Sequence, residues 1–222
     1  MITPLLLSLR VAILATGLAL VVGVAVAALL ARRRSPLASL ADALVNLPLV
    51  LPPTVLGYYL LVAFGARSPI GAFLERIGLP LVFTWRGAVV AAAVVAIPLV
   101  IQSSKAALEA VDLSLADVAR TLGRSEISIF FTISLPLAAR GILAGTMLAF
   151  ARALGEFGAT LLVASNIPGR TQTLPIAIYD AVQVGDQARA NALALLLTVT
   201  AVALLFGMRR LGSSLAAGQG GG

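Results

Sequence analysis

The longest interval between apolar runs in this chain reads SKAALEAVDLSLADVARTLGRSEISIFFTISLP, from Ser104 to Pro136. Within it, Ser114 is followed three residues later by Asp117, a spacing typical of the capping box that opens a helix. The next apolar residues share one helical face because they recur at i, i+3, i+4 and i+7: Leu115, Val118, Ala119 and Leu122. Gly123 can adopt the left-handed conformation that ends a helix. The interval therefore predicts a short amphipathic helix over residues 114–124.

Apolar runs flank this interval and make up most of the chain. Of 222 residues, 60% are hydrophobic and 11% are charged, and the mean hydropathy is +1.05. Soluble domains average about 25% charged residues. We therefore predict an all-α, polytopic membrane protein with five transmembrane helices in a membrane domain of residues 1–212. We expect a loop at 105–136, a flexible tail at 213–222, and spans at about 8–31, 41–65, 86–104, 137–163 and 190–209.

Several kinds of chemistry are excluded by missing residues. The chain has no Cys and no His, which removes disulfides, the usual metal ligands and the usual general base. It has no GxxxxGK[ST] motif for binding the phosphates of ATP. We therefore expect no enzyme activity, metal site or cofactor in this chain.

The basic residues predict the orientation in the membrane. The net charge is +7, but most basic residues flank apolar runs, which indicates a topology signal and not nucleic-acid binding. Arg32, Arg33 and Arg34 follow the first run and place residues 32–39 in the cytoplasm. The same alternation places residues 105–136 and the C-terminus in the cytoplasm, and the N-terminus outside.

The predicted helix at 114–124 has two interpretations. It could lie on the inner leaflet as a connector, or it could dock its apolar stripe into a groove of a partner protein. Its polar residues, among them Asp117 and Arg120, lie on the other faces, which suits both interpretations.

The same interval resembles the signature loop of ABC-importer permeases. The signature runs EAA, three residues, Gly, nine residues and I-x-L-P, and here its positions hold Asp117, Val118, Ala119, Gly123, Ile133, Leu135 and Pro136. Asp and Val replace the first Glu and Ala, and the spacing is kept. The resemblance implies a type I ABC-importer-like fold in which residues 114–124 form a coupling helix seated on a cytoplasmic ATPase subunit.

Further segments are similar to molybdate permease subunits of such importers. They include NLPLVLPPTVLG at Asn46–Gly57, FTWRGA at Phe83–Ala88, LAFARALGEFGAT at Leu148–Thr160 and SNIPG at Ser165–Gly169. The resemblance implies a bacterial inner-membrane protein that works with ATPase subunits, a second copy of itself and an extracytoplasmic molybdate-binding protein. ATP and Mg²⁺ would be bound by the ATPase. Sulfate permeases share much of this pattern but are usually longer, and tungstate cannot be separated from molybdate by shape or charge.

Span two contains residues that suit a transport pathway. Pro48, Pro52 and Pro53 each remove a backbone donor, and Pro52 and Pro53 free carbonyls one turn earlier. Such backbone is tolerated in a membrane where it is buried in protein or lines a wet cavity. The run is therefore either a kinked helix or a pathway segment with Asn46 and Thr54 as its polar candidates.

Span four carries two charges at membrane depth. Arg152 and Glu156 are four residues apart and can form an intrahelical ion pair. The pair could fix the helix bundle, or, with Gly155, it could belong to a gate. A small-residue face at Gly141, Gly145, Ala149 and Ala153 suits close packing either within one subunit or between two copies.

Two other functions remain to be weighed against an importer subunit. A stand-alone carrier could use Arg152 and Glu156 for proton coupling, but the chain shows no internal repeat. A non-transporting scaffold would leave the charged and proline-broken spans without a purpose. We expect no high-affinity oxyanion site in the chain, because a pathway that binds its ion tightly also traps it.

Overall fold

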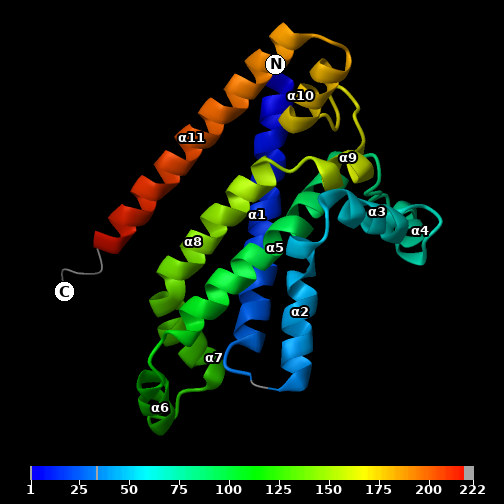
Figure 1. Ribbon diagram of the computed structural model, residues 1–222. Helices are drawn as coiled ribbons and strands as arrows, with labels where there is room; N and C mark the ends of the chain where they lie inside the picture. Colours follow the sequence, from blue (N-terminus) through cyan, green and yellow to red (C-terminus); the bar gives the residue numbers. More distant parts are fainter. Residues whose placement is uncertain (1, 34, 218–222) are drawn as a thin grey trace.

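The computed structural model describes residues 2–33 and 35–217, and the described part is built from helices (Figure 1). In chain order these are α1 (Ile2–Leu30), α2 (Pro36–Val50), α3 (Pro53–Phe64), α4 (Pro69–Arg76), α5 (Trp85–Glu109), α6 (Leu113–Thr121), α7 (Glu126–Ile129), the π-helical turn η1 (Phe130–Ser134), α8 (Leu135–Leu154), α9 (Gly158–Ala164), α10 (Leu174–Gln183) and α11 (Gln187–Ala217). Helix α6 lies at one end of the molecule, and α10 lies at the opposite end beside the N-terminus.

The core is formed by α1, α5 and α8, which meet through small side chains. Fully or almost fully buried alanines line the contacts: Ala12, Ala15 and Ala19 on α1, Ala88, Ala92 and Ala96 on α5, and Ala149 and Ala153 on α8. Small side chains let helix backbones approach closely, and this packing drives association in lipid, where apolar burial gains little. The small-residue face of α8 therefore serves packing within one subunit.

Glycines of α8 bring its backbone against α5. A Cβ atom added to Gly145 would lie 2.5 Å from the Cβ of Ser103, and one added to Gly141 would lie 2.5 Å from the Cβ of Ala107. Neither position has room for a side chain, which fixes the distance between the two helices.

Four described helical stretches are long and apolar enough to cross a membrane, and one bent pair could form a fifth span. The four are α1, α5, the continuous helix over Glu126–Leu154, and α11 over Gln187–Gly207. The pair is α2 and α3, whose axes differ by 112°. The predicted second span is thus two helices pointing in different directions, because Pro52 and Pro53 start a new helix instead of bending the old one.

The predicted fourth span is shifted toward the N-terminus. Its helix begins at Glu126 instead of 137 and ends at Leu154 instead of 163. Pro136 is the second residue of α8 and lies well inside the continuous helix over Glu126–Leu154. The π-helical turn just before it accommodates the proline, since Leu135 donates its N–H to the carbonyl of Phe130, five residues earlier.

Helix α11 diverges from the core toward its C-terminal end (Figure 1). Its described buried side chains, Ala190 and Leu193, lie near its start and pack with α10. The helix continues through residues 213–217 of the predicted tail, and residues 218–222 lie outside the described part of the chain.

Replacing Gly145 by Ala should weaken the contact between α5 and α8. We expect Gly145→Ala to lower the thermal midpoint of the purified chain by several degrees, because overpacking costs about 1–3 kcal/mol. Gly17→Ala is the matched control, since a Cβ there meets no atom within 4 Å and should raise helix stability slightly. Equal midpoints for both variants would contradict this account of the core.

Candidate functional site

Helix α6 is the amphipathic helix that the sequence predicts, with a different first residue. The structure places the N-cap at Asp112, whose carboxylate accepts the backbone N–H of Ser114 at 2.9 Å. Ser114 is therefore inside the first turn and is not the cap, which corrects the expected capping box. The hydrogen bond from the Ser114 N–H lowers the pKa of Asp112 below its usual range.

The C-terminus of α6 follows the prediction for Gly123. This residue has a φ of +77°, the left-handed conformation that glycine adopts at low cost. The N–H of Gly123 bonds the carbonyl of Arg120, and the N–H of Arg124 bonds that of Ala119. The pair of bonds is a Schellman motif, which ends the helix at Thr121 with Leu122 as its C-cap.

The predicted apolar stripe divides into a packed part and an exposed part. Ala119 is 7% exposed and packs, with Ala116, against Ile129 of α7. Leu115, Val118 and Leu122 are 46%, 60% and 77% exposed. Three large apolar side chains of α6 are thus exposed, and α6 itself lies at one end of the molecule (Figure 1).

Arg120 joins α6 to the helix that leads into the membrane. Its guanidinium binds both carboxylate oxygens of Glu126, with Nε–Oε1 at 2.6 Å and Nη2–Oε2 at 3.0 Å, and it also pairs with Asp117. The hydrogen bonds to Glu126 and Asp117 raise the pKa of Arg120 above its usual range. This bidentate geometry fixes direction as well as distance.

The other signature residues anchor the same end to the core. Ile133 packs against the cluster of Ala116, Ala119 and Ile129. Leu135 packs against a second cluster that contains residues of α1, α5 and α8. Side chains from the I-x-L-P segment therefore contact both α6 and the membrane core.

Arg32 has a role that its place in a basic cluster did not reveal. Its guanidinium donates to the carbonyls of Leu108 and Val111 at 3.0 and 2.5 Å, where α5 ends. It thereby satisfies carbonyls that the helix end leaves free. The end of α1 is held to the end of α5, close to α6.

The pathway candidates of α2 form polar contacts with α5. Asn46 accepts a hydrogen bond from Gln102 at 2.9 Å, and Asp42 pairs with Lys105 at 3.0 Å. Because α2 has no buried residue, these contacts position it. Asn46 is therefore engaged with a side chain of α5.

The other charged candidates lie where α8 ends and α9 begins. Arg152 is in the last turn of α8, and Gly155 follows as its C-cap. Glu156 is 2% exposed, and its Oε2 lies 2.7 Å from Nη1 of Arg152, a close ion pair without a linear hydrogen bond. Its Oε1 accepts the N–H of Ala159 in the first turn of α9 at 2.8 Å. The predicted ion pair thus spans a helix break and does not lie within one helix.

The break in α2–α3 and the break in α8–α9 meet in space. A Cβ added to Gly158 would lie 3.2 Å from the Cβ of Pro53 and 3.3 Å from the Cγ2 of Thr54. One turn further on, a Cβ on Gly57 would lie 2.9 Å from the Cα of Ala159. Pro53 and Thr54 are therefore next to the segment that holds Glu156, whereas Asn46 lies further down α2.

The loop at 165–173 is polar and partly buried, which the sequence alone does not predict. Only its SNIPG segment stands out in the sequence, by its similarity to molybdate permeases. Thr171 and Gln172 are 1% and 4% exposed. Gln172 donates to Asn166 at 2.9 Å, and Asn166 donates to Asp180 of α10 at 2.9 Å. A SNIPG turn followed by closely spaced Thr and Gln was the available signal, but its polar residues look like an ordinary surface loop.

Comparison with known proteins assigns the family. Residues 19–216 match the family described as "Binding-protein-dependent transport system inner membrane component". The chain belongs to this family. It is 51% identical to the molybdenum transport system permease protein ModB of Escherichia coli K12 over 179 residues, 80% of this chain and 78% of that one. It is 43% identical to the putative molybdenum transport system permease protein YvgM of Bacillus subtilis over 205 residues, 92% and 90% of the two chains.

Solved structures of ABC transporters share this fold. An inward-facing MetNI methionine ABC transporter matches with a TM-score of 0.76 at 18% identity, over 96% of this chain and 94% of that chain. A bacterial ABC transporter involved in the import of alginate matches with a TM-score of 0.74 at 14% identity, over 96% and 79%. These matches show that the chain has the fold of a type I ABC importer permease. The family match and the apolar helices show that it is a multi-pass membrane protein. The described residues of this inner-membrane component contain no group of three or more His, Cys, Asp or Glu side chains suited to a metal ion.

Removing the cap of α6 should loosen that helix. We expect Asp112→Ala to destabilise the helix, seen as faster hydrogen exchange over residues 113–121. Ser114→Ala is the comparison variant: it keeps the backbone N–H that Asp112 accepts and loses only the hydroxyl contact to Asp112, so it should exchange more slowly than Asp112→Ala. Because the pKa of Asp112 is depressed, its stabilising effect is present above the unfolded value and is lost as the pH falls through the folded one. Exchange that is faster in Ser114→Ala than in Asp112→Ala would instead make Ser114 the cap.

Removing the charge of Glu156 should leave Arg152 without its counter-ion. The amide oxygen of Glu156→Gln can still accept the N–H of Ala159, so the variant tests the charge alone. We expect a lower thermal midpoint, with a cost below the ~3–5 kcal/mol of fully buried pairs, because the Arg152 side chain is 33% exposed. The double variant with Arg152→Gln should recover most of the loss. A single variant as stable as the parent would show that the ion pair does not fix the break.

Proposed function

We propose that this chain is the membrane-spanning permease subunit of an ATP-driven importer that moves molybdate into the cytoplasm. The similarity to permeases named for molybdenum transport, at 51% and 43% identity, supports this substrate. Tungstate has the same charge and shape and is included in the proposal. The chain would transport without hydrolysing ATP, and separate ATPase subunits would bind ATP and Mg²⁺.

The proposal that α6 couples the chain to the ATPase rests on the exposed apolar face of this helix. Leu115, Val118 and Leu122 would dock into a groove of the ATPase, as an amphipathic helix does when its apolar face has a complementary partner. The remaining coupling residues would stabilise the helix that presents this face. Ser114 and Asp117 lie in its first turns, Ala119 packs it against α7, Arg120 pairs it with Glu126, and Gly123 follows its C-cap. Helix α6 would then be cytoplasmic, with the C-terminus on its side and the N-terminus outside.

A continuous helix would carry motion from α6 to the membrane. Arg120 attaches α6 to Glu126, and the helix that begins at Glu126 runs unbroken to Leu154. Those 29 residues span roughly 43 Å at 1.5 Å per residue. The far end holds Arg152 and the break with Glu156. A pull on α6 would therefore reach the point where both broken helices meet.

The meeting of the two breaks is the proposed pathway or gate region. Pro52, Pro53 and Thr54 come from one side and Gly155 and Glu156 from the other, as in the clustering around Gly158. Arg152 neutralises Glu156, so the region does not repel a dianion strongly. A second copy of the chain would complete the pore, and an extracytoplasmic molybdate-binding protein would deliver the ion at the α10 end.

Reconstitution separates this function from the alternatives. The chain, a partner ATPase and an oxyanion-binding protein in liposomes should take up molybdate only when ATP is hydrolysed. Uptake without the ATPase, driven by a pH gradient, would favour a proton-coupled carrier. A sulfate-binding protein can be added in place of the molybdate-binding protein in the same liposomes. ATP-dependent uptake of sulfate with the former, and no uptake of molybdate with the latter, would favour a sulfate permease.

A charge on the docking face should uncouple transport. We expect Leu122→Asp to reduce ATP-dependent uptake at least tenfold, since burying a carboxylate in an apolar groove costs several kcal/mol. Binding of the ATPase should weaken in parallel, while membrane insertion stays intact. The matched control is Ile77→Asp, which charges a 50% exposed apolar residue after α4 and should transport normally. Normal uptake by Leu122→Asp would rule out the docking assignment.

A further inference from the structure

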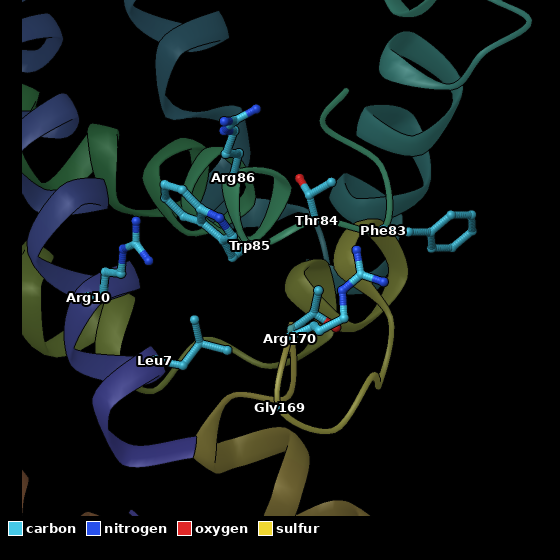
Figure 2. Close-up of a pocket in the computed structure, with 9 residues that line it drawn as sticks. Leu7, Arg10, Phe83, Thr84, Trp85, Arg86, Gly169 and Arg170 are labelled. Carbon is cyan, nitrogen blue, oxygen red and sulfur yellow. The ribbon is translucent and has the colours of Figure 1, made fainter. Parts of the chain in front are cut away.

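A polar pocket opens at the end of the molecule opposite α6, and the function proposed above does not use it. Its volume is about 460 Å³, and it lies between the first turns of α1, the start of α5 and the loop before α10. Three of its lining residues are arginines: Arg10, Arg86 and Arg170. In Figure 2, Arg10 and Arg170 lie on opposite sides of the opening, and Trp85 lies between them in this view, on the side of Arg10.

No acidic side chain in the lining of this pocket balances its positive charge. No Asp or Glu lines it, and the ion pairs found among residues 2–33 and 35–217 include none of its three arginines. Three guanidinium groups around one cavity repel one another unless an anion lies between them. The start of α5, a helix of 25 residues, adds the positive end of its dipole.

Trp85 orients the guanidinium of Arg10. The Cζ atom of Arg10 lies 3.8 Å from the centroid of the indole ring, and that of Arg86 lies 5.7 Å from it. A stacked guanidinium keeps the N–H groups on its edge free to bind oxygen atoms, in pairs that match an oxyanion. The indole thus holds Arg10 in place and leaves its donors available.

Local hydrogen bonds hold the two loop segments that line the pocket, the one with Arg170 and the one before α5. Thr171, next to Arg170, is 1% exposed and bonds the N–H of Ile167 and the carbonyl of Ser165. In the segment before α5, Phe83 has a φ of +59°, a costly conformation for a residue with a Cβ, and its N–H bonds the carbonyl of Val163. The arginines therefore project from a pre-organised frame, which lowers the entropic cost of binding.

We propose that this pocket binds a tetrahedral oxyanion through Arg10, Arg86 and Arg170. The anion is either a free dianion such as sulfate or tungstate, or the phosphate of an anionic lipid headgroup. Its open, solvent-accessible form suits weak and reversible binding, which agrees with the absence of a tight site on a transport pathway. If the chain imports an oxyanion, the pocket is a station for that ion at the outer mouth. This last role rests on the proposed function, but the site itself does not.

The pocket contains its own reporter, since Trp85 is the one tryptophan of the chain. The full chain is placed in phosphatidylcholine liposomes, and Trp85 emission is titrated with sodium sulfate and sodium tungstate against chloride at equal ionic strength. We expect a saturable change with the dianions. Arg170→Gln should weaken the apparent affinity roughly tenfold, the effect of losing a hydrogen bond to a charged group. Arg189→Gln, which removes a basic residue at the same end but outside the pocket, is the matched control.

The second arm identifies the source of the oxyanion. If sulfate and tungstate produce no response, but phosphatidylglycerol in the liposomes shifts Trp85 emission and Arg170→Gln removes the shift, the ligand is a lipid phosphate. No response in either arm, or equal weakening by Arg189→Gln, overturns the site. A response to a glutamate-rich peptide alone also overturns it and favours a protein partner. The titration needs no ATPase and no transport, so its failure is distinguishable from a failure of molybdate uptake.

Discussion

The close approach of α1, α5 and α8 is the constraint on which the other features depend. In a bilayer, apolar side chains gain little by leaving lipid for protein, so association relies on contact between backbones. The alanines at these contacts and Gly141 and Gly145 make that contact possible. Because these three helices pack tightly, helices that rest on them can be interrupted without loss of the fold. Both interrupted elements, α2–α3 and α8–α9, rest against this core, and irregular backbone is tolerated at such depth when protein surrounds it.

Side chains satisfy backbone groups at the break between α8 and α9 and at both ends of α5. The carboxylate of Glu156 accepts an N–H at the start of α9, and Arg32 covers the carbonyls where α5 ends. The N-terminus of α5 is capped by Thr84, which accepts the N–H of Gly87. Charged and hydroxyl side chains in this apolar chain therefore act mainly on helix ends. Their positions coincide with the two ends of the molecule and with the break between α8 and α9, where a transport cycle would need the backbone to be defined.

The sequence predicted the elements that depend on neighbouring residues and missed those that depend on distant ones. The apolar runs located α1, α5 and α11, and Gly123 marked the end of α6. Pro52 and Pro53 marked a break but not its 112° angle, which depends on how α3 packs against α9. The cap at Asp112 was missed because Ser114 fits the capping-box spacing equally well. The arginine pocket could not be predicted, because Arg10, Arg86 and Arg170 come from three separate segments.

The π-helical turn at Phe130–Ser134 changes the phase of the continuous helix over Glu126–Leu154. An extra residue in one turn rotates everything beyond it by about 100° relative to an uninterrupted α-helix. The side of this helix that receives α6, at Ile129, and the side that presses on α5, at Gly145, are therefore set independently. A single-residue deletion in this turn would keep both surfaces intact while turning one away from its neighbour. The turn acts as an angular spacer between two interfaces on one helix.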